Sequence, residues 1–361
     1  MLLLGSLATA KVNDARLACI PPRERREGTF DSLRAFLVGE SQRQPVVVVL
    51  DDLQWMDETS AELLGHLVGT AGAHRLLVVA CYRPEYDAPW SRHSAVAPLA
   101  LKPLAEGEQG RLMQEALRAQ RLDPGLSALL SERSGGNPFV LEELAAALLE
   151  QGAVAREGDR CWLSGSEAMR VVPDTIQDVI MARIDQLDEP VKRVLQVAAV
   201  IGRDFTFDLL RAVAGAGEEL RTSLGRLVEL ELIREKTIFP VWEFSFKNAL
   251  VQEVAYRNVL AGRRQEVHER VARAVEALAG DRLEDSYELL AHHLGESADA
   301  DRAVHYLTLA GEKAARHFAV GAARRYYEHA IDRLTALPAA AAAAYADRLK
   351  DRLARLATSS A

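Results

Sequence analysis

The sequence has few cysteines, few aromatic residues and no long apolar run. Its three cysteines lie far apart and form no C-x-x-C pair, which excludes a disulfide framework and a zinc knuckle. No segment reaches the roughly 18 apolar residues that a membrane-spanning helix needs. Acidic residues (52) outnumber basic ones (44), and this balance argues against a general nucleic-acid coat. We expect a protein of the reducing cytoplasm, with no membrane partner.

What the chain does have is alanine, leucine and length. Its 361 residues exceed the roughly 250–300 at which single hydrophobic cores stop growing, so more than one domain is expected. The composition, 49% hydrophobic and 27% charged, is typical of globular proteins, and the scarcity of aromatics favours helix. Cys81 lies in an apolar run, which predicts a small core residue.

The most informative segment is residues 46–57, VVVVLDDLQWMD. A run of five apolar residues is typical of a parallel strand that is buried on both faces. Asp51 and Asp52 follow directly, and in open α/β sheets the chemistry lies just beyond the carboxyl ends of the strands. Two carboxylates there can hold Mg²⁺ and polarise a water, as in nucleotide hydrolysis. The alternative is a buried strand followed by an acid-rich turn.

The usual phosphate-binding partner of such a site is missing. Backbone N–H groups and a lysine of the pattern G-x-x-x-x-G-K-[ST] cradle nucleotide phosphates. This pattern occurs nowhere in the 361 residues. We therefore expect an N-terminally truncated nucleotide-switch protein.

The first hundred residues predict an α/β arrangement. Residues 29–42 have helical spacing with Thr29 as a plausible cap, and residues 58–72 form a second helix with one apolar face. Residues 76–81 read as a second strand, which completes a strand–helix–strand unit. Residues 98–104 are a candidate third strand.

The rest of the chain is predicted to be mainly helical. Asn137 and Pro138 start a helix that runs to residue 151, because asparagine caps well and proline suits the first turn. A short hairpin is expected around Trp162. A helix starts at residues 173–177, where Asp174 and Gln177 have a capping-box-like spacing. Further helices are predicted at the following ranges: 190–200, 205–213 and 218–232.

Two strands are predicted next, at 232–236 and 242–246. Several short helices followed by such a two-stranded ribbon are typical of a winged helix. Beyond residue 248 the chain is helical again. Alanine and tyrosine recur there twenty residues apart, a spacing that indicates successive packed helices rather than a 34-residue repeat. The recurring residues are Ala303, Tyr306, Ala310 and Ala323, Tyr326, Ala330.

Taken in order, five motifs resemble those of the signal-transduction ATPases with numerous domains (STAND). The chain looks most like the AAA-type ATPase and tetratricopeptide-like (TPR-like) portion behind cyclase domains in bacterial multidomain regulators linked to adenylate or guanylate cyclase. The resemblance covers residues 15–335. Its motifs are VVVVLDDLQWMD, VVACYRPE, SGGNPFVLEEL, VPDTIQDVIMARIDQL and FSFKNALVQEVAYRNVL with RRQEVHERVARAVE.

The resemblance implies a fold and a division into domains. It implies a partial P-loop NTPase sheet of α/β class, followed by mostly α structure. The expected domains are a partial AAA/STAND nucleotide-binding domain (1–104), a helical lid (105–170), a winged-helix domain (171–262) and a TPR-like helical region (263–361). By the same resemblance the missing first strand would lie beside 76–81, whose edge would then be open and apolar.

The resemblance also implies roles for single residues, with ATP or ADP and Mg²⁺ as cofactors. Asp51 would bind Mg²⁺ in the Walker B role, and Asp52 would orient or deprotonate the attacking water. Arg83 would be the sensor arginine that contacts the γ-phosphate; an arginine fork can bind phosphate in this way. A surface salt bridge is the alternative for Arg83.

Two further positions would reach the nucleotide from the helical part. Gly136, Asn137 and Pro138 match a motif whose proline packs on adenine in relatives, although an ordinary helix start explains it equally well. Asn248 stands where relatives carry a histidine that reaches the ADP phosphate. Asparagine can donate a hydrogen bond but cannot become cationic, so the closed state would be held less firmly.

These observations leave three hypotheses for function. The first is a regulatory STAND-type ATPase fragment that binds or hydrolyses ATP weakly on its own, because its phosphate-binding loop and the N-terminal nucleotide-binding and cyclase regions are missing. The second is a non-catalytic scaffold whose C-terminal helices bind a protein partner. The third, direct DNA binding, is disfavoured because the candidate recognition helix within 218–232 is rich in glutamate.

Overall fold

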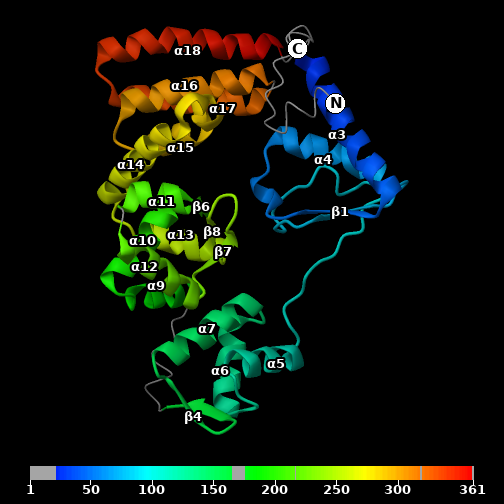
Figure 1. Ribbon diagram of the computed structural model, residues 1–361. Helices are drawn as coiled ribbons and strands as arrows, with labels where there is room; N and C mark the ends of the chain where they lie inside the picture. Colours follow the sequence, from blue (N-terminus) through cyan, green and yellow to red (C-terminus); the bar gives the residue numbers. More distant parts are fainter. Residues whose placement is uncertain (1–21, 165–174, 216, 318, 360–361) are drawn as a thin grey trace. The chain divides into compact units, whose positions relative to one another are not determined.

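The computed structural model describes residues 22–164, 175–215, 217–317 and 319–359 (Figure 1). Helices dominate the described residues, and three small sheets lie among them. The chain divides into two compact units. The first unit is drawn from residues 1–100, 287–295 and 299–361, and the second from residues 101–286 and 296–298.

The first unit contains a two-stranded parallel sheet with two helices packed on it. Helix α3 (Pro22–Arg43) leads into β1 (Val46–Leu50), and α4 (Glu58–Ala71) connects β1 to β2 (Leu76–Ala80). The two strands pair in parallel along their full length. The predicted strand–helix–strand unit is therefore confirmed. Asp57 caps α4, because its carboxylate accepts a hydrogen bond from the backbone N–H of Ser60.

Among the described residues, only one face of this sheet is covered. The side chains of Val47, Val49 and Leu77 are 59%, 64% and 57% exposed, whereas their neighbours along the strands are buried or half-buried. Such alternation shows that α3 and α4 share one face of the sheet. The prediction of a strand buried on both faces is wrong, since nothing in the described part of the chain covers the second face.

Three smaller expectations from the sequence are also wrong. Residues 98–104 form no strand, and Leu99 and Leu101 are exposed. Thr29 caps no helix, because α3 begins seven residues earlier and the Thr29 hydroxyl donates to the Arg25 carbonyl inside it. Cys81 lies just past the end of β2 and is exposed, so it is not a core residue.

The second unit begins with a group of elements that we call the first helical group. Its elements are α5 (Glu106–Ala116), β3 (Arg121–Leu122), α6 (Pro124–Ser134), α7 (Pro138–Glu150), β4 (Val154–Glu157) and β5 (Arg160–Leu163). Strands β4 and β5 form the hairpin predicted around Trp162. Leucines of the three helices and Cys161 build one apolar core.

A second helical group follows in the same unit. Its elements are α9 (Ile176–Asp185), α10 (Glu189–Ile201), β6 (Asp204–Thr206), α11 (Phe207–Ala214), α12 (Glu218–Glu229), β7 (Ile233–Thr237), β8 (Glu243–Phe246) and α13 (Ala249–Arg257). Strand β8 lies between β6 and β7, and all pairing is antiparallel. Thr175 caps α9; the predicted capping residue Asp174 lies outside the described residues.

Helix α14 (Ala261–Ala279) is the last α-helix of the second unit, and the first unit resumes with packed helices (Figure 1). These are α15 (Tyr287–Gly295), α16 (Ala300–Arg316), α17 (Val320–Arg333) and α18 (Ala339–Ser359). Each packs against its successor, and the recurring alanines are buried as expected. On α17 the buried tyrosine is Tyr327, one residue beyond the one that the spacing indicates.

A small α/β sheet followed by mainly helical structure is the fold class that the sequence predicts. The proposed division into four domains stays a prediction.

Candidate functional site

The carboxyl ends of β1 and β2 lie at one edge of the sheet, and each continues into a predicted site residue. Two backbone hydrogen bonds hold the segments that leave this edge together. The Cys81 N–H donates to the Leu50 carbonyl at 2.8 Å, and the Leu53 N–H donates to the Cys81 carbonyl at 3.1 Å. Asp51 and Asp52 therefore leave the sheet beside the segment that carries Arg83.

Gln54 joins these two segments through its side chain. Its amide nitrogen donates to Oδ1 of Asp52 at 3.0 Å, and its amide oxygen accepts the Arg83 N–H at 3.3 Å. The amide thus holds an acidic side chain and the arginine-bearing backbone at a set spacing. Sequence reasoning assigned no role to Gln54, although it stands inside the motif at residues 46–57.

Asp52 is held in an unusual backbone conformation. Its φ of 56° and ψ of 41° are left-handed, a region that non-glycine residues adopt rarely and that aspartate tolerates better than most. The Asp52 N–H donates to Oδ1 of Asp51 at 2.9 Å, so the two acids are locally connected. Backbone strain of this kind is found disproportionately at functional sites.

Charges at this edge are open to solvent. Asp51 and Arg83 are exposed, and Trp55 is 76% exposed. Within the described residues neither the Asp51 carboxylate nor the Arg83 guanidinium forms an ion pair, so the surface salt bridge considered for Arg83 is absent there. Carboxylate oxygens in this setting are suitable ligands for Mg²⁺.

Gly136, Asn137 and Pro138 belong to the second unit, where they start α7. Gly136 has a φ of +76°, and a Cβ there would lie 2.8 Å from Cβ of Pro103, so only glycine fits. The Asn137 side chain accepts hydrogen bonds from the N–H groups of Phe139 and Val140, and Pro138 occupies the first helical turn. The predicted helix start is confirmed, and it accounts for these residue types without a ligand.

Asn248 is likewise a helix cap. It precedes α13, and its Oδ1 accepts the Leu250 N–H at 2.8 Å. The side-chain oxygen of Asn248 accepts this hydrogen bond from the helix backbone. Its side-chain NH₂ group is therefore the part that can donate to an anion. Of the predicted site residues, the structure brings together Asp51, Asp52 and Arg83; the others lie in the second unit.

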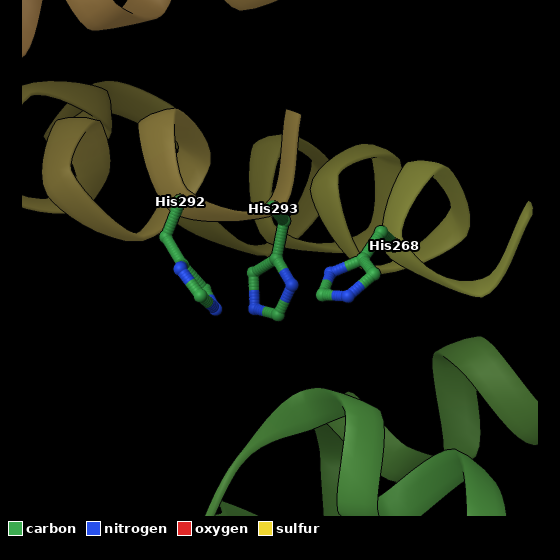
Figure 2. Close-up of side chains that lie close together, drawn as sticks. All are labelled: His268, His292 and His293. Atoms are coloured by element: carbon green, nitrogen blue, oxygen red, sulfur yellow. The ribbon is translucent and has the colours of Figure 1, made fainter. Parts of the chain in front are cut away.

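Two adjacent histidines lie on α15. Figure 2 shows His292 and His293 at neighbouring positions of α15, where their ring centroids lie 5.0 Å apart. His293 is fully buried and His292 is exposed. His268, labelled in the same figure, belongs to α14 in the second unit, where its Nε2 lies 3.1 Å from the Tyr256 hydroxyl.

None of the described helices combines the length and apolar character that crossing a bilayer requires.

Comparisons with known proteins agree with the geometry of the first unit. Residues 4–79 match the family of AAA ATPase domains. An uncharacterized protein of Rhizobium meliloti (strain 1021) is 28% identical over 315 residues, which cover 86% of this chain and 30% of that protein. The chain thus spans about a third of this curated relative.

A solved structure shares the fold. It is a Signal Transduction ATPase with Numerous Domains (STAND) protein with a tetratricopeptide repeat sensor from Pyrococcus horikoshii. The TM-score is 0.52 at 13% identity, covering 92% of this chain and 54% of the other. The AAA match over residues 4–79 and the shared fold agree with the expected likeness to AAA-type ATPases followed by a helical region.

Proposed function

We propose that this chain is the regulatory portion of a STAND-type ATPase that acts in signal transduction in the cytoplasm. Nucleotide exchange and hydrolysis would shift the arrangement of its modules. In this proposal the first helical group is the lid, the second is a winged helix, and the C-terminal helices bind a protein partner. Because the sequence contains no G-x-x-x-x-G-K-[ST], the chain on its own binds and hydrolyses ATP weakly or not at all.

The observation that carries the proposal is the hydrogen-bonded edge where β1 and β2 end. Asp51 would hold Mg²⁺, which when bound neutralises charge on the phosphates. Asp52, oriented by Gln54, would position the attacking water, and Arg83 would contact the γ-phosphate. The match of residues 4–79 to AAA ATPase domains supports the same assignment.

Calorimetry tests the nucleotide part of this proposal. The chain is titrated with Mg-ATP and, separately, with Mg-ADP. We expect no saturable heat below about 1 mM, since no loop grips the β- and γ-phosphates. Binding in the micromolar range would show that the chain holds phosphates by other groups.

A second candidate is a non-catalytic scaffold, and one observation favours it. The bare sheet face exposes Val47, Val49 and Leu77, an apolar surface of the kind that proteins use for association. Asp52→Asn separates the two candidates in a longer protein that carries the phosphate-binding loop. If the protein is an ATPase, Asp52→Asn should lower kcat by at least about 100-fold. If it is a scaffold, the variant should bind its partner unchanged, and there is no ATPase activity to lose. Glu58→Gln, an exposed acid beyond the same edge, is the matched control.

A further inference from the structure

Arg183 of α9 contacts both helical groups at once. Its guanidinium donates to Glu143 and Glu150 of α7, in the first group, with distances to the two Glu150 oxygens of 3.1 and 2.8 Å. It also donates to the carbonyl of Leu230, at the end of α12 in the second group, at 2.9 Å. The Arg183 side chain is only 6% exposed.

The face of α9 that carries Arg183 also makes apolar contacts with the core of the first helical group. Val179 lies one turn before Arg183, so both project from one side of the helix. Val179 is buried in the core of the first helical group, and Ile176 packs on that core while half-buried. The buried Ile180 and Ile184 of α9 do not belong to this core.

The buried charges make this contact specific. Glu143 is 2% exposed, and burial raises the pKa of its carboxyl despite the opposing attraction of Arg183. A guanidinium offers several donors in a fixed plane, and here it meets two carboxylates and a carbonyl together. Removing the guanidinium while α7 and α9 remain packed would leave the buried Glu143 carboxylate without its cation, which is strongly destabilising.

A second cation supports the same contact. Lys247, between β8 and α13, lies 2.5 Å from Glu231 and 3.8 Å from Glu142 of α7. Its hydrogen bond lowers the pKa of Glu231. Arg183 and Lys247, both in the second helical group, therefore face acids of α7.

We propose that Arg183 couples the first and second helical groups, so that they open and move as one cooperative body. A displacement at the start of α7, where Gly136 and Asn137 lie, would then pass to α12 through the Arg183 guanidinium. This coupling goes beyond the proposed function and does not depend on nucleotide binding.

Native-state hydrogen exchange measures the coupling directly. Amides of α7 and amides of α13 are followed in the same chain, because cooperative bodies open with one shared free energy. In the unaltered chain we expect the slowest amides of both helices to share that value. In Arg183→Met we expect those of α7 to exchange at least about tenfold faster relative to those of α13.

The ratio of the amide exchange rates of α7 and α13 decides whether Arg183 couples the two helical groups. A merely structural role for Arg183 would speed both helices by the same factor, and that result would overturn the proposal. So would different values for the two helices in the unaltered chain. Arg226→Met, which breaks an exposed pair with Glu229 on α12, should leave the ratio unchanged.

A milder variant keeps the test valid if Arg183→Met does not fold. Arg183→Lys retains the charge but cannot reach all three acceptors at once. We expect the same separation of α7 from α13 at smaller size, and an unchanged ratio in a folded Arg183→Lys protein would contradict the coupling.

Discussion

Gly311 provides a sharp test of how the C-terminal helices pack. It lies inside α16 and is buried against the ring of Tyr327 on α17, which is itself 2% exposed. A Cβ at position 311 would lie 2.7 Å from Cδ1 and 3.0 Å from Cζ of that ring, closer than real contacts allow. Gly311→Ala therefore forces the two helices apart.

Two opposing effects set the expected change in the free energy of unfolding of Gly311→Ala. Overpacking a core typically costs about 1–3 kcal/mol. Alanine in place of glycine inside a helix returns about 0.5–1 kcal/mol, because it lowers the entropy of the unfolded chain. We expect Gly311→Ala to lower the free energy of unfolding by about 1–2 kcal/mol.

Urea unfolding followed by far-UV circular dichroism measures this loss, and hydrogen exchange over α16 and α17 localises it. Gly225→Ala in α12 is the matched control: a Cβ there meets nothing within 4 Å, so this variant should gain stability. In a Tyr327→Ala background Gly311→Ala should cost little. If Gly311→Ala proves as stable as Gly225→Ala, the close packing of α16 on Tyr327 is refuted.

Two further predictions concern the second unit. Asn137→Ala should cost about 1 kcal/mol in urea unfolding, because two N–H groups at the start of α7 lose their acceptor, while Asn137→Asp should retain most of the stability. Arg183→Met should cost about 3–5 kcal/mol at pH 7, because two acids lose their buried partner. The pKa of the Glu143 carboxyl is higher in the folded state than in the unfolded state, and loss of the guanidinium raises it further. The folded variant therefore binds the proton more tightly than the unfolded chain does. The stability lost in Arg183→Met should then shrink as the pH falls from 7 toward 4.5. An equal deficit at pH 7 and pH 5 would contradict this assignment.

The sequence located the candidate site better than it described the surroundings. Asp51, Asp52 and Arg83 follow apolar runs, and parallel strands bring such positions to one edge, so their proximity was predictable. Gln54 was not identified, because a glutamine within a motif carries no signal of its own until its two partners are seen. The left-handed conformation of Asp52 was equally invisible, since many sequences could adopt that turn.

The predictions from sequence were wrong where the local pattern did not match the packing of the folded chain. The run at 46–50 has the composition of a doubly covered strand, but α3 and α4 pack on the same face and leave Val47 and Val49 exposed. Residues 98–104 have strand-like composition but no neighbour to pair with among the described residues. A strand needs a hydrogen-bonding partner, and sequence alone does not supply one.

Local chemistry determined the helices, their caps and the acid-rich motif after β1, because capping, turn preference and apolar periodicity act within a few residues. Only the tertiary structure decided which face of the sheet is covered, how Gln54 spans two segments, and that Arg183 meets acids 33 and 40 positions away in the chain. Those outcomes depend on which elements pack together, and contacts between distant residues are not encoded in any single stretch of the chain.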